Sequence, residues 1–246
     1  MREQLAELGR IGLFLFRILG ALRLQRGQLR DIVLQVYSVG ARTVPIIAVG
    51  GAFVGLVLSL QGYRTLETFG ATNALGTLLG LTLFRELGPV LTAILFCGRA
   101  GSAMAAELGL MRATDQITAL SMMAIDPVGK VVAPRFVAGL LGVPLLTAVF
   151  CAFAILGGYV QAVLVLGVDA GHFWGNLRAS IDLGEDFGQT FVKAAFFGLT
   201  CSLIATYVGY HAEPTIEGTS VATTRSVVHG SLMVLFLDFI ISATLY

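Results

Sequence analysis

Five long apolar runs constrain the fold of this chain more than any other feature of its sequence. They cover about residues 40–62, 75–98, 136–166, 188–210 and 227–246. Each run is close to the roughly 20 residues that an α-helix needs to cross the hydrocarbon core of a bilayer. The chain is 56% hydrophobic and only 13% charged, whereas a soluble domain carries roughly 25% charged residues. The sequence therefore predicts an all-α polytopic membrane protein with five transmembrane helices.

Glycine and proline in the first two runs leave two questions open. Pro45 and the Gly50-Gly51 pair weaken a helix at the start of the first run, so a hairpin or re-entrant segment is an alternative to a complete span. Two pairs of glycines, Gly51/Gly55 and Gly76/Gly80, match the small-xxx-small pattern of closely packed membrane helices. These pairs predict close contacts, either within the chain or across a dimer.

Basic residues predict how the protein is oriented in the membrane. Six arginines precede the first run and Arg42 lies at its start, and the segment 99–135 carries four more basic residues. We predict Arg225 in the loop before the last span. The loops on the other side hold only Arg64 and Arg178. The positive-inside rule therefore places the N-terminus and the segment 99–135 in the cytoplasm, and five spans then place the C-terminus on the far side.

The first 30 residues predict an amphipathic helix that lies in the cytoplasmic membrane interface. Arg10 and Arg17 interrupt the apolar positions, so this segment is not expected to be a cleaved signal peptide. The residues at helical spacing are Leu5, Leu8, Gly12, Leu15, Leu19 and Leu22. Such a helix is held by burial of its apolar face and by anionic lipid. A basic leader that orients the first span is the other interpretation.

Arg85 and Glu86 are adjacent charges inside the second apolar run. A charge within a membrane span is expensive and indicates a functional site. Adjacent residues on a helix do not face each other, so at least one of the two must face another helix or a polar cavity. Lys193 and Asp238, in the fourth and fifth runs, are candidate counter-charges. Two interpretations remain: buried ion pairs that fix the helix register, or a cavity that binds a charged headgroup between apolar walls.

The segment 104–126 predicts a cytoplasmic coupling region. The second span is expected to continue as a helix as far as Arg112, and Thr114 is expected to cap a second, short helix that stops before Pro127. Ile117 and Leu120 lie on the apolar face of this short helix. Because a helix this short gains little stability alone, we expect it to dock on the membrane domain or on a soluble subunit.

Sequence motifs for chemistry on this chain are absent. The sequence has no GxxxxGK[ST], GxSxG or HExxH motif. Its three cysteines lie within or near different spans and are expected to be small packing residues, and its three histidines are far apart. We therefore predict no catalytic residue, no metal ligand and no nucleic-acid partner. If nucleotide drives a transport step, another polypeptide must bind the ATP and Mg²⁺.

Two long motifs resemble the MlaE (YrbE-like) permeases, which are the membrane subunits of MCE-associated ABC transporters. The motifs are FRELGPVLTAILFCGRAGSAMAAELGLMRATDQITALSMMAIDPVGKVVAPR and, at the C-terminus, ATTRSVVHGSLMVLFLDFIISATLY. Between them, GVDAGHFWGNL and the prolines Pro134 and Pro144 also fit the family. The resemblance covers nearly the whole chain after the N-terminal segment.

The resemblance implies one permease domain over residues 1–246 that forms a homodimer in the bacterial inner membrane. It implies a cytoplasmic ABC ATPase docked on the coupling region, a STAS-domain protein bound to that ATPase, and a periplasmic ring of MCE-domain proteins. The implied cargo is glycerophospholipid, carried between the inner and outer membranes to maintain lipid asymmetry. The chain itself would then be a transport subunit and not an enzyme.

The resemblance also implies roles for particular residues. By position, Leu66, Phe69, Arg85 and Glu86 line or border the lipid cavity. The residues implied for coupling to the ATPase are Glu107, Arg112, Asp115, Ile117 and Leu120.

Two other classes of protein remain as alternatives. An ion-coupled secondary transporter of an amphipathic substrate would show inverted repeats and matching broken helices. No repeat relates the two halves of this sequence, and five spans do not divide evenly. A membrane-embedded enzyme that acts on lipids would need a nucleophile or a metal cluster near the interface, and the sequence suggests neither.

Overall fold

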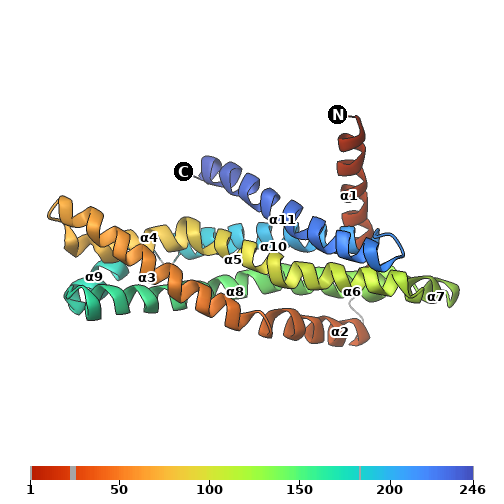
Figure 1. Ribbon diagram of the computed structural model, residues 1–246, viewed down its shortest axis with the longest axis horizontal. Helices are drawn as coiled ribbons and strands as arrows, with labels where there is room; N and C mark the ends of the chain where they lie inside the picture. The colour runs from red at the N-terminus through yellow and green to blue at the C-terminus, as the bar shows by residue number, and fades with distance from the viewer. Residues whose placement is uncertain (1, 23–25, 183, 246) are drawn as a thin grey trace.

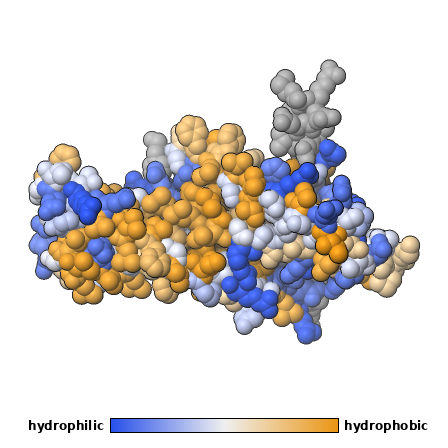
Figure 2. Space-filling model, in the orientation of Figure 1, coloured by the Kyte–Doolittle hydropathy of each residue, from blue (hydrophilic) through white to orange (hydrophobic). Residues whose placement is uncertain are grey.

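The protein is a bundle of membrane-length helices. The computed structural model describes residues 2–22, 26–182 and 184–245, and within these residues every regular element is a helix (Figure 1). Five helical runs are long and apolar enough to cross a membrane: Arg30–Thr68, Thr72–Ala113, Val128–Val165, Glu185–Tyr210 and Ile216–Thr244. Figure 2 shows a broad hydrophobic band across the middle of the molecule, with hydrophilic residues gathered towards its two ends. The prediction of an all-α protein with five spans is confirmed.

The first run is a nearly continuous helix. It consists of α2 (Arg26–Val36), the π-helical segment η1 (Tyr37–Ala41) and α3 (Val44–Thr68). Pro45 lies in the first turn of α3, where its missing N–H removes no helical hydrogen bond. Because α3 continues for 25 residues through Gly50 and Gly51, the hairpin and re-entrant alternatives are wrong.

The second and third runs are long helices with π-helical interruptions. The second run contains η2 (Thr72–Ala74), α4 (Leu75–Thr82), η3 (Leu83–Leu87), α5 (Gly88–Phe96), η4 (Cys97–Gly101) and α6 (Ser102–Ala113). The third contains η5 (Val128–Val132), α8 (Ala133–Tyr159) and η6 (Val160–Val165). Wider π-helical turns shift the carbonyls of the preceding turn away from their usual donors, and such turns are frequent at functional sites.

The C-terminal part of the bundle consists of α9 (Ala170–Ser180), α10 (Glu185–Tyr210) and α11 (Ile216–Leu245). Arg225 lies inside α11, so its predicted place in a loop is wrong. The charged residues at 217 and 225 do not end the helix, and Ala222 between them is buried against the bundle. The helix that contains the last span therefore starts at Ile216, well before the predicted residue 227.

Glycines allow α3 and α8 to pack backbone against backbone. A Cβ atom on Gly51 would lie 2.6 Å from the carbonyl oxygen of Phe150 in α8, and Cβ atoms on Gly55 and Gly157 would overlap the opposing backbone outright. A Cβ on Gly76 in α4 would likewise overlap the backbone of α9. Both glycine pairs therefore make contacts within the chain, which confirms the first of the two interpretations.

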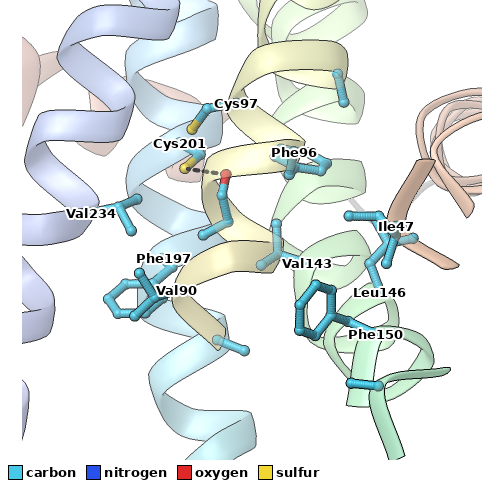
Figure 3. Packing of buried hydrophobic residues seen from close by; sticks show 14 of the residues in the cluster. Ile47, Val90, Phe96, Cys97, Val143, Leu146, Phe150, Phe197, Cys201 and Val234 are labelled. Carbon is cyan, nitrogen blue, oxygen red and sulfur yellow. Dashed lines mark hydrogen bonds between the residues drawn. The ribbon is translucent and has the colours of Figure 1, made fainter. Parts of the chain in front are cut away.

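The largest apolar core joins α3, α5, α8, α10 and α11 (Figure 3). Phe96, Phe150 and Phe197 are fully buried in it. Cys97 and Cys201 lie among these side chains as free thiols, and the Sγ of Cys201 is 3.9 Å from the carbonyl oxygen of Ala93. The cysteines therefore pack as small apolar groups, as the sequence indicates.

Helix α1 (Arg2–Ala21) projects sideways from one end of the bundle (Figure 1). Phe14 and Ile18 are buried against η5, α8 and α10, whereas Leu13, Phe16 and Leu19 are exposed. A helix that crosses the bundle with an exposed apolar side suits the predicted interfacial position. The predicted segment 1–30 is divided here, since α1 ends at Ala21 and α2 begins at Arg26; residues 1 and 23–25, and the side chains of Leu5 and Leu8, lie outside the described part of the chain.

The coupling region follows the predicted order with one correction. Helix α6 continues the second span as far as Ala113, and the short helix α7 (Gln116–Met122) follows. Thr114 does not cap α7: its hydroxyl donates to the carbonyl oxygen of Leu110 at 2.8 Å, and it ends α6 instead. Asp115, between the two helices, has a left-handed backbone conformation with φ of 56°. The chain therefore changes direction at Asp115, and α7 begins after this residue and not after Thr114.

Candidate functional site

The second span is interrupted at membrane depth by η3, which contains Arg85. The Gly88 N–H bonds to the carbonyl oxygen of Leu83, five residues back, so it is not directed at Phe84. Pro89 has no N–H to donate to the carbonyl oxygen of Arg85. The carbonyls of Phe84 and Arg85 therefore lack their usual helical donors. Unpaired carbonyls are costly in hydrocarbon, so donors from another span stabilise this segment.

Helix α10 supplies these donors through two buried side chains. The Thr190 hydroxyl donates to the carbonyl oxygen of Phe84 at 2.7 Å, and Lys193 Nζ donates to that of Arg85 at 3.2 Å. The Thr190 hydroxyl also lies 2.6 Å from the carbonyl oxygen of Asp186, so its single proton is shared between two acceptors. The interrupted segment of the second span is thus held by side chains of the fourth.

An ion pair between Arg85 and Asp186 makes a second link between the same two spans. Arg85 Nε lies 2.9 Å from Asp186 Oδ1, and the other carboxylate oxygen of Asp186 accepts from the backbone N–H of Asp182 at 2.9 Å. Asp186 is buried, whereas 39% of the Arg85 side chain is exposed. The buried carboxylate therefore orients a guanidinium group that still reaches the surface of the bundle.

A second ion pair joins α10 to α11. Lys193 Nζ lies 2.6 Å from Asp238 Oδ1 and donates to the hydroxyl of Ser242 at 2.8 Å. The approach to Asp238 meets the distance of an ion pair but not the angles of a hydrogen bond. Only 3% of the Lys193 side chain is exposed. Lys193 and Asp238 therefore pair with each other, and Lys193 reaches Arg85 only through its backbone carbonyl.

The four predicted lipid-contacting residues lie in two places in the chain. Arg85 and the exposed Glu86 belong to η3. Leu66 packs in a cluster around Leu75 at the start of α4, and Phe69 at the end of α3 is 79% exposed. From Leu75 to Arg85 the helix rises about 15 Å at 1.5 Å per residue. One chain alone therefore does not bring the two pairs together.

Sequence reasoning missed three members of this network: Asp186, Thr190 and Ser242. The spacing of these residues along their helices could have indicated them. Asp186 and Thr190 precede Lys193 by seven and three residues, which places all three on one side of a helix, and Ser242 follows Asp238 by four. We define the polar network as Arg85, Asp186, Thr190, Lys193, Asp238 and Ser242.

The predicted coupling residues make contacts that tie α6 to neighbouring spans. Glu107 Oε2 lies 3.1 Å from Arg135 Nη2 at the start of α8. Arg112 Nη1 donates to the carbonyl oxygen of Tyr210 at 2.6 Å, which links the end of α6 to the end of α10. A displacement of α6 would therefore pull on the helix that carries Lys193.

Helix α7 has a buried side and an exposed end. Ile117 is buried and Leu120 packs on the cluster around α1 and α8, while Asp115 forms the left-handed turn before the helix. Met122 and Met123 at the other end of α7 are highly exposed. Exposed methionines beside a short docked helix form an adaptable apolar surface.

The side chains at this site are suited to binding a charged group. Within the described part of the chain, no three His, Cys, Asp or Glu side chains gather as metal ligands would. The polar network consists of two ion pairs and two hydroxyls at membrane depth. Such groups join helices and can bind an ionic group that enters the bilayer.

Comparison with known proteins gives consistent matches along the chain. The family model described as Permease MlaE matches residues 32–244. The chain is 48% identical to the intermembrane phospholipid transport system permease protein MlaE of Haemophilus influenzae, over 97% of this chain and 92% of that protein. It is 32% identical to a probable ABC transporter permease protein of Rickettsia felis, over 96% of this chain and 91% of that protein. A protein of Arabidopsis thaliana chloroplasts, TRIGALACTOSYLDIACYLGLYCEROL 1, is 27% identical over 90% of this chain and 64% of its own length.

The fold is that of a multi-pass helical membrane protein, and the matches to proteins named as permeases place it in the class of membrane permeases. The matches cover most of the chain and specify which family of permeases it is. The protein belongs to the MlaE permease family, and the resemblance seen in its two long motifs is confirmed.

Proposed function

We propose that this protein is the permease subunit of an ABC transporter that moves glycerophospholipids between the inner and outer membranes and so maintains outer-membrane lipid asymmetry. Its similarity to a permease that is named for intermembrane phospholipid transport supports the proposal. The structural observation that carries it is the polar network at membrane depth, because a lipid headgroup that enters the bilayer needs ionic partners there.

In this proposal Arg85 binds the lipid phosphate. A guanidinium group fits phosphate because it can donate two parallel hydrogen bonds. Asp186 holds the guanidinium from its buried side, and Glu86 stands next to it on the exposed side. Leu66 and Phe69, further along the membrane normal, border the part of the cavity that holds acyl chains.

A homodimer would complete the cavity. In the most apolar stretch of α11 only 11% of the residues are buried within one chain. The exposed stripe of α11 consists of Val228, Leu232, Leu235 and Phe239, at a spacing typical of a helix–helix contact. Pairing of two copies along this stripe would cover it and bring two polar networks near a common axis.

A separate cytoplasmic ABC ATPase would bind ATP and Mg²⁺ and dock on the exposed end of α7, with a STAS-domain protein attached to it. Its motion would pass through α6 and the Arg112–Tyr210 hydrogen bond to α10 and the polar network. A periplasmic ring of MCE-domain proteins would receive or deliver lipid at the other end of the spans. The N-terminus would then be cytoplasmic and the C-terminus periplasmic. Nucleotide can drive this cycle only if the two conformations differ in affinity for lipid.

The test begins with purification of the tagged full-length chain from its native membranes and mass spectrometry of the proteins and lipids that accompany it. We expect an ATPase, an MCE-domain protein and phospholipid. Reconstituted with those subunits, the Arg85→Gln variant should lose lipid transfer but keep ATPase docking. The matched control is Arg64→Gln, which changes an exposed arginine outside the polar network.

Two outcomes would contradict the proposal. Transport that follows an ion gradient and ignores ATP would favour the ion-coupled alternative, in which the Lys193–Asp238 pair binds and releases the coupling ion. Chemical turnover of lipid by the purified chain would favour a membrane-embedded enzyme.

A further inference from the structure

A cavity of about 860 Å³ is lined by residues of α1, of the end of α10 and of the start of α11. Figure 1 shows where these three helices meet. Its volume is in the range of pockets that enclose a small-molecule ligand. The cavity is remote from the polar network, since α10 rises about 21 Å from Lys193 to Tyr207, which lines the cavity. A ligand in this cavity would therefore be separate from a lipid at Arg85.

Charged side chains of both signs line this cavity. Arg10, Arg17 and Arg225 contribute guanidinium groups, and Glu213 and Glu217 contribute carboxylates. Among the side chains that the structure describes, none of the five pairs with another. Arg17 alone has an ion-pair partner, Asp126 at 3.9 Å, and both of those side chains are more than half exposed. Positive and negative groups that face one cavity without pairing suit a ligand that carries both charges.

Aromatic and apolar side chains form the rest of the cavity wall. The ring of Phe14 packs edge-on to that of Tyr207, with 5.5 Å between centroids, and His211 packs against both rings. Leu13 and Val221 line the cavity and are exposed at its rim. Tyrosines at the end of a span are typical of the depth at which lipid headgroups meet the hydrocarbon. The cavity therefore lies where a headgroup and the first part of its acyl chains would be.

We infer that the cavity binds the headgroup of a zwitterionic phospholipid, with a phosphate and a primary ammonium, as a resident lipid of that leaflet. The arginines of α1 and α11 donate charge-assisted hydrogen bonds to the phosphate oxygens. Glu213 and Glu217 accept hydrogen bonds from the ammonium. The acyl chains leave past Leu13 and Val221. The lipid thereby ties α1 to the α10–α11 turn, where Phe14 already packs against His211.

The experiment measures lipid retained by the full-length protein, purified in mild detergent, by native mass spectrometry. Delipidated protein is then titrated with phosphatidylethanolamine, phosphatidylglycerol or the soluble headgroup glycerophosphoethanolamine. The test variants are Arg10→Gln/Arg225→Gln, which removes phosphate donors, and Glu213→Gln/Glu217→Gln, which removes ammonium acceptors. The matched control, Arg64→Gln/Arg178→Gln, changes two exposed arginines at the other end of the molecule. Val221→Trp narrows the rim of the cavity without altering its charge.

We expect phosphatidylethanolamine to bind about tenfold or more weakly to the arginine variant and to Val221→Trp, and unchanged to the control. The glutamate variant should bind the two lipids equally. Arg85→Gln, which alters the transport site, should retain this resident lipid. Equal binding of both lipids by the unmodified protein, or equal retention by the arginine variant and the control, would overturn the inference. So would glycerophosphoethanolamine binding as tightly as the lipid, because the ligand would then be a free phosphoester.

Discussion

Two helix contacts in this molecule are stabilised in opposite ways. Helices α3 and α8 meet through glycines, and their backbones approach so closely that a single added Cβ would overlap the opposing chain. Helices α10, α11 and the segment η3 meet through the polar network, which consists of ion pairs and of hydrogen bonds from a hydroxyl and an ammonium group to backbone carbonyls. The first contact is a matter of shape alone. The second depends on charge, and a ligand or a neighbouring subunit can compete for it.

The difference shows which part of the bundle can change during transport. Lipid chains cannot replace the close backbone contact between α3 and α8, so these two helices should move as one body. The polar network has partners that can be exchanged, because a phosphate could share the guanidinium of Arg85 with Asp186. Rearrangement between the second, fourth and fifth spans is therefore the motion that lipid binding would favour.

The largest effect is expected from removing one charge of the buried ion pair. Lys193→Met leaves Asp238 without its counter-charge and removes the Lys193 hydrogen bond to the Arg85 carbonyl, which should cost about 3–5 kcal/mol of unfolding free energy. Unfolding by SDS in mixed micelles would measure it. The double variant Lys193→Met/Asp238→Leu should recover part of the loss, because no charge is left unpaired. If the double variant is as unstable as the sum of two independent changes, the pair is not coupled.

A smaller loss is expected at the glycine contact. Gly55→Ala forces α3 away from α8 and should cost about 3 kcal/mol, near the upper end of overpacking effects. Gly188→Ala is the matched control, since nothing lies within 4 Å of the added Cβ in α10, and it should leave stability unchanged or raise it by about 1 kcal/mol or less. The same micelle titration compares them. Equal behaviour of the two variants would show that α3 and α8 do not touch in this way.

Loss of the Thr190 hydroxyl should lower stability by less than the glycine change, and it tests whether this hydroxyl stabilises the π-helical segment η3. Thr190→Val keeps the shape of the side chain but leaves the Phe84 carbonyl without its donor, which should cost about 1–3 kcal/mol. Thr190→Ser, which keeps the hydroxyl, should cost much less. Hydrogen exchange of the amides in residues 83–92 would show where the loss falls. Unchanged exchange in Thr190→Val would mean that the hydroxyl does not hold η3.

The smallest effect is expected outside the membrane. Glu107→Gln breaks the ion pair with Arg135, in which the Glu107 side chain is about half exposed, so it should change stability by about 0–1 kcal/mol. The effect should shrink further in high salt because exposed charges are screened. A loss of stability comparable with that of Lys193→Met would remove the distinction between ion pairs at membrane depth and ion pairs outside the membrane.

Much of the fold could be predicted because the membrane restricts it so strongly. Runs of apolar residues specified five helical spans, and the pattern around Ile117 specified a short helix after the second. The ends of the helices were harder to place. Arg225 was expected in a loop, yet it lies inside α11, because a helix that leaves the hydrocarbon no longer needs apolar residues to continue.

The partners of the charged residues were the part that sequence reasoning missed. Arg85, Lys193 and Asp238 stood out because charge is rare in spans, but Asp186 looked like part of a loop and Thr190 like an ordinary helix residue. The role of Thr190 follows from Gly88-Pro89, which leaves the Phe84 carbonyl without its usual helical donor, whereas Asp186 pairs with the side chain of Arg85. No local pattern states which span will supply a missing donor.

By itself, the sequence determined that this protein crosses the membrane five times, carries charge at membrane depth and follows its second span with a short helix. Hydrocarbon allows no other way to bury such runs, and that constraint acts on each segment separately. The tertiary structure alone decided that Arg85 pairs with Asp186 and Lys193 with Asp238. Those choices depend on which faces of three helices meet, and that is set by the packing of the whole bundle, including a backbone contact between α3 and α8 in which no charged residue takes part.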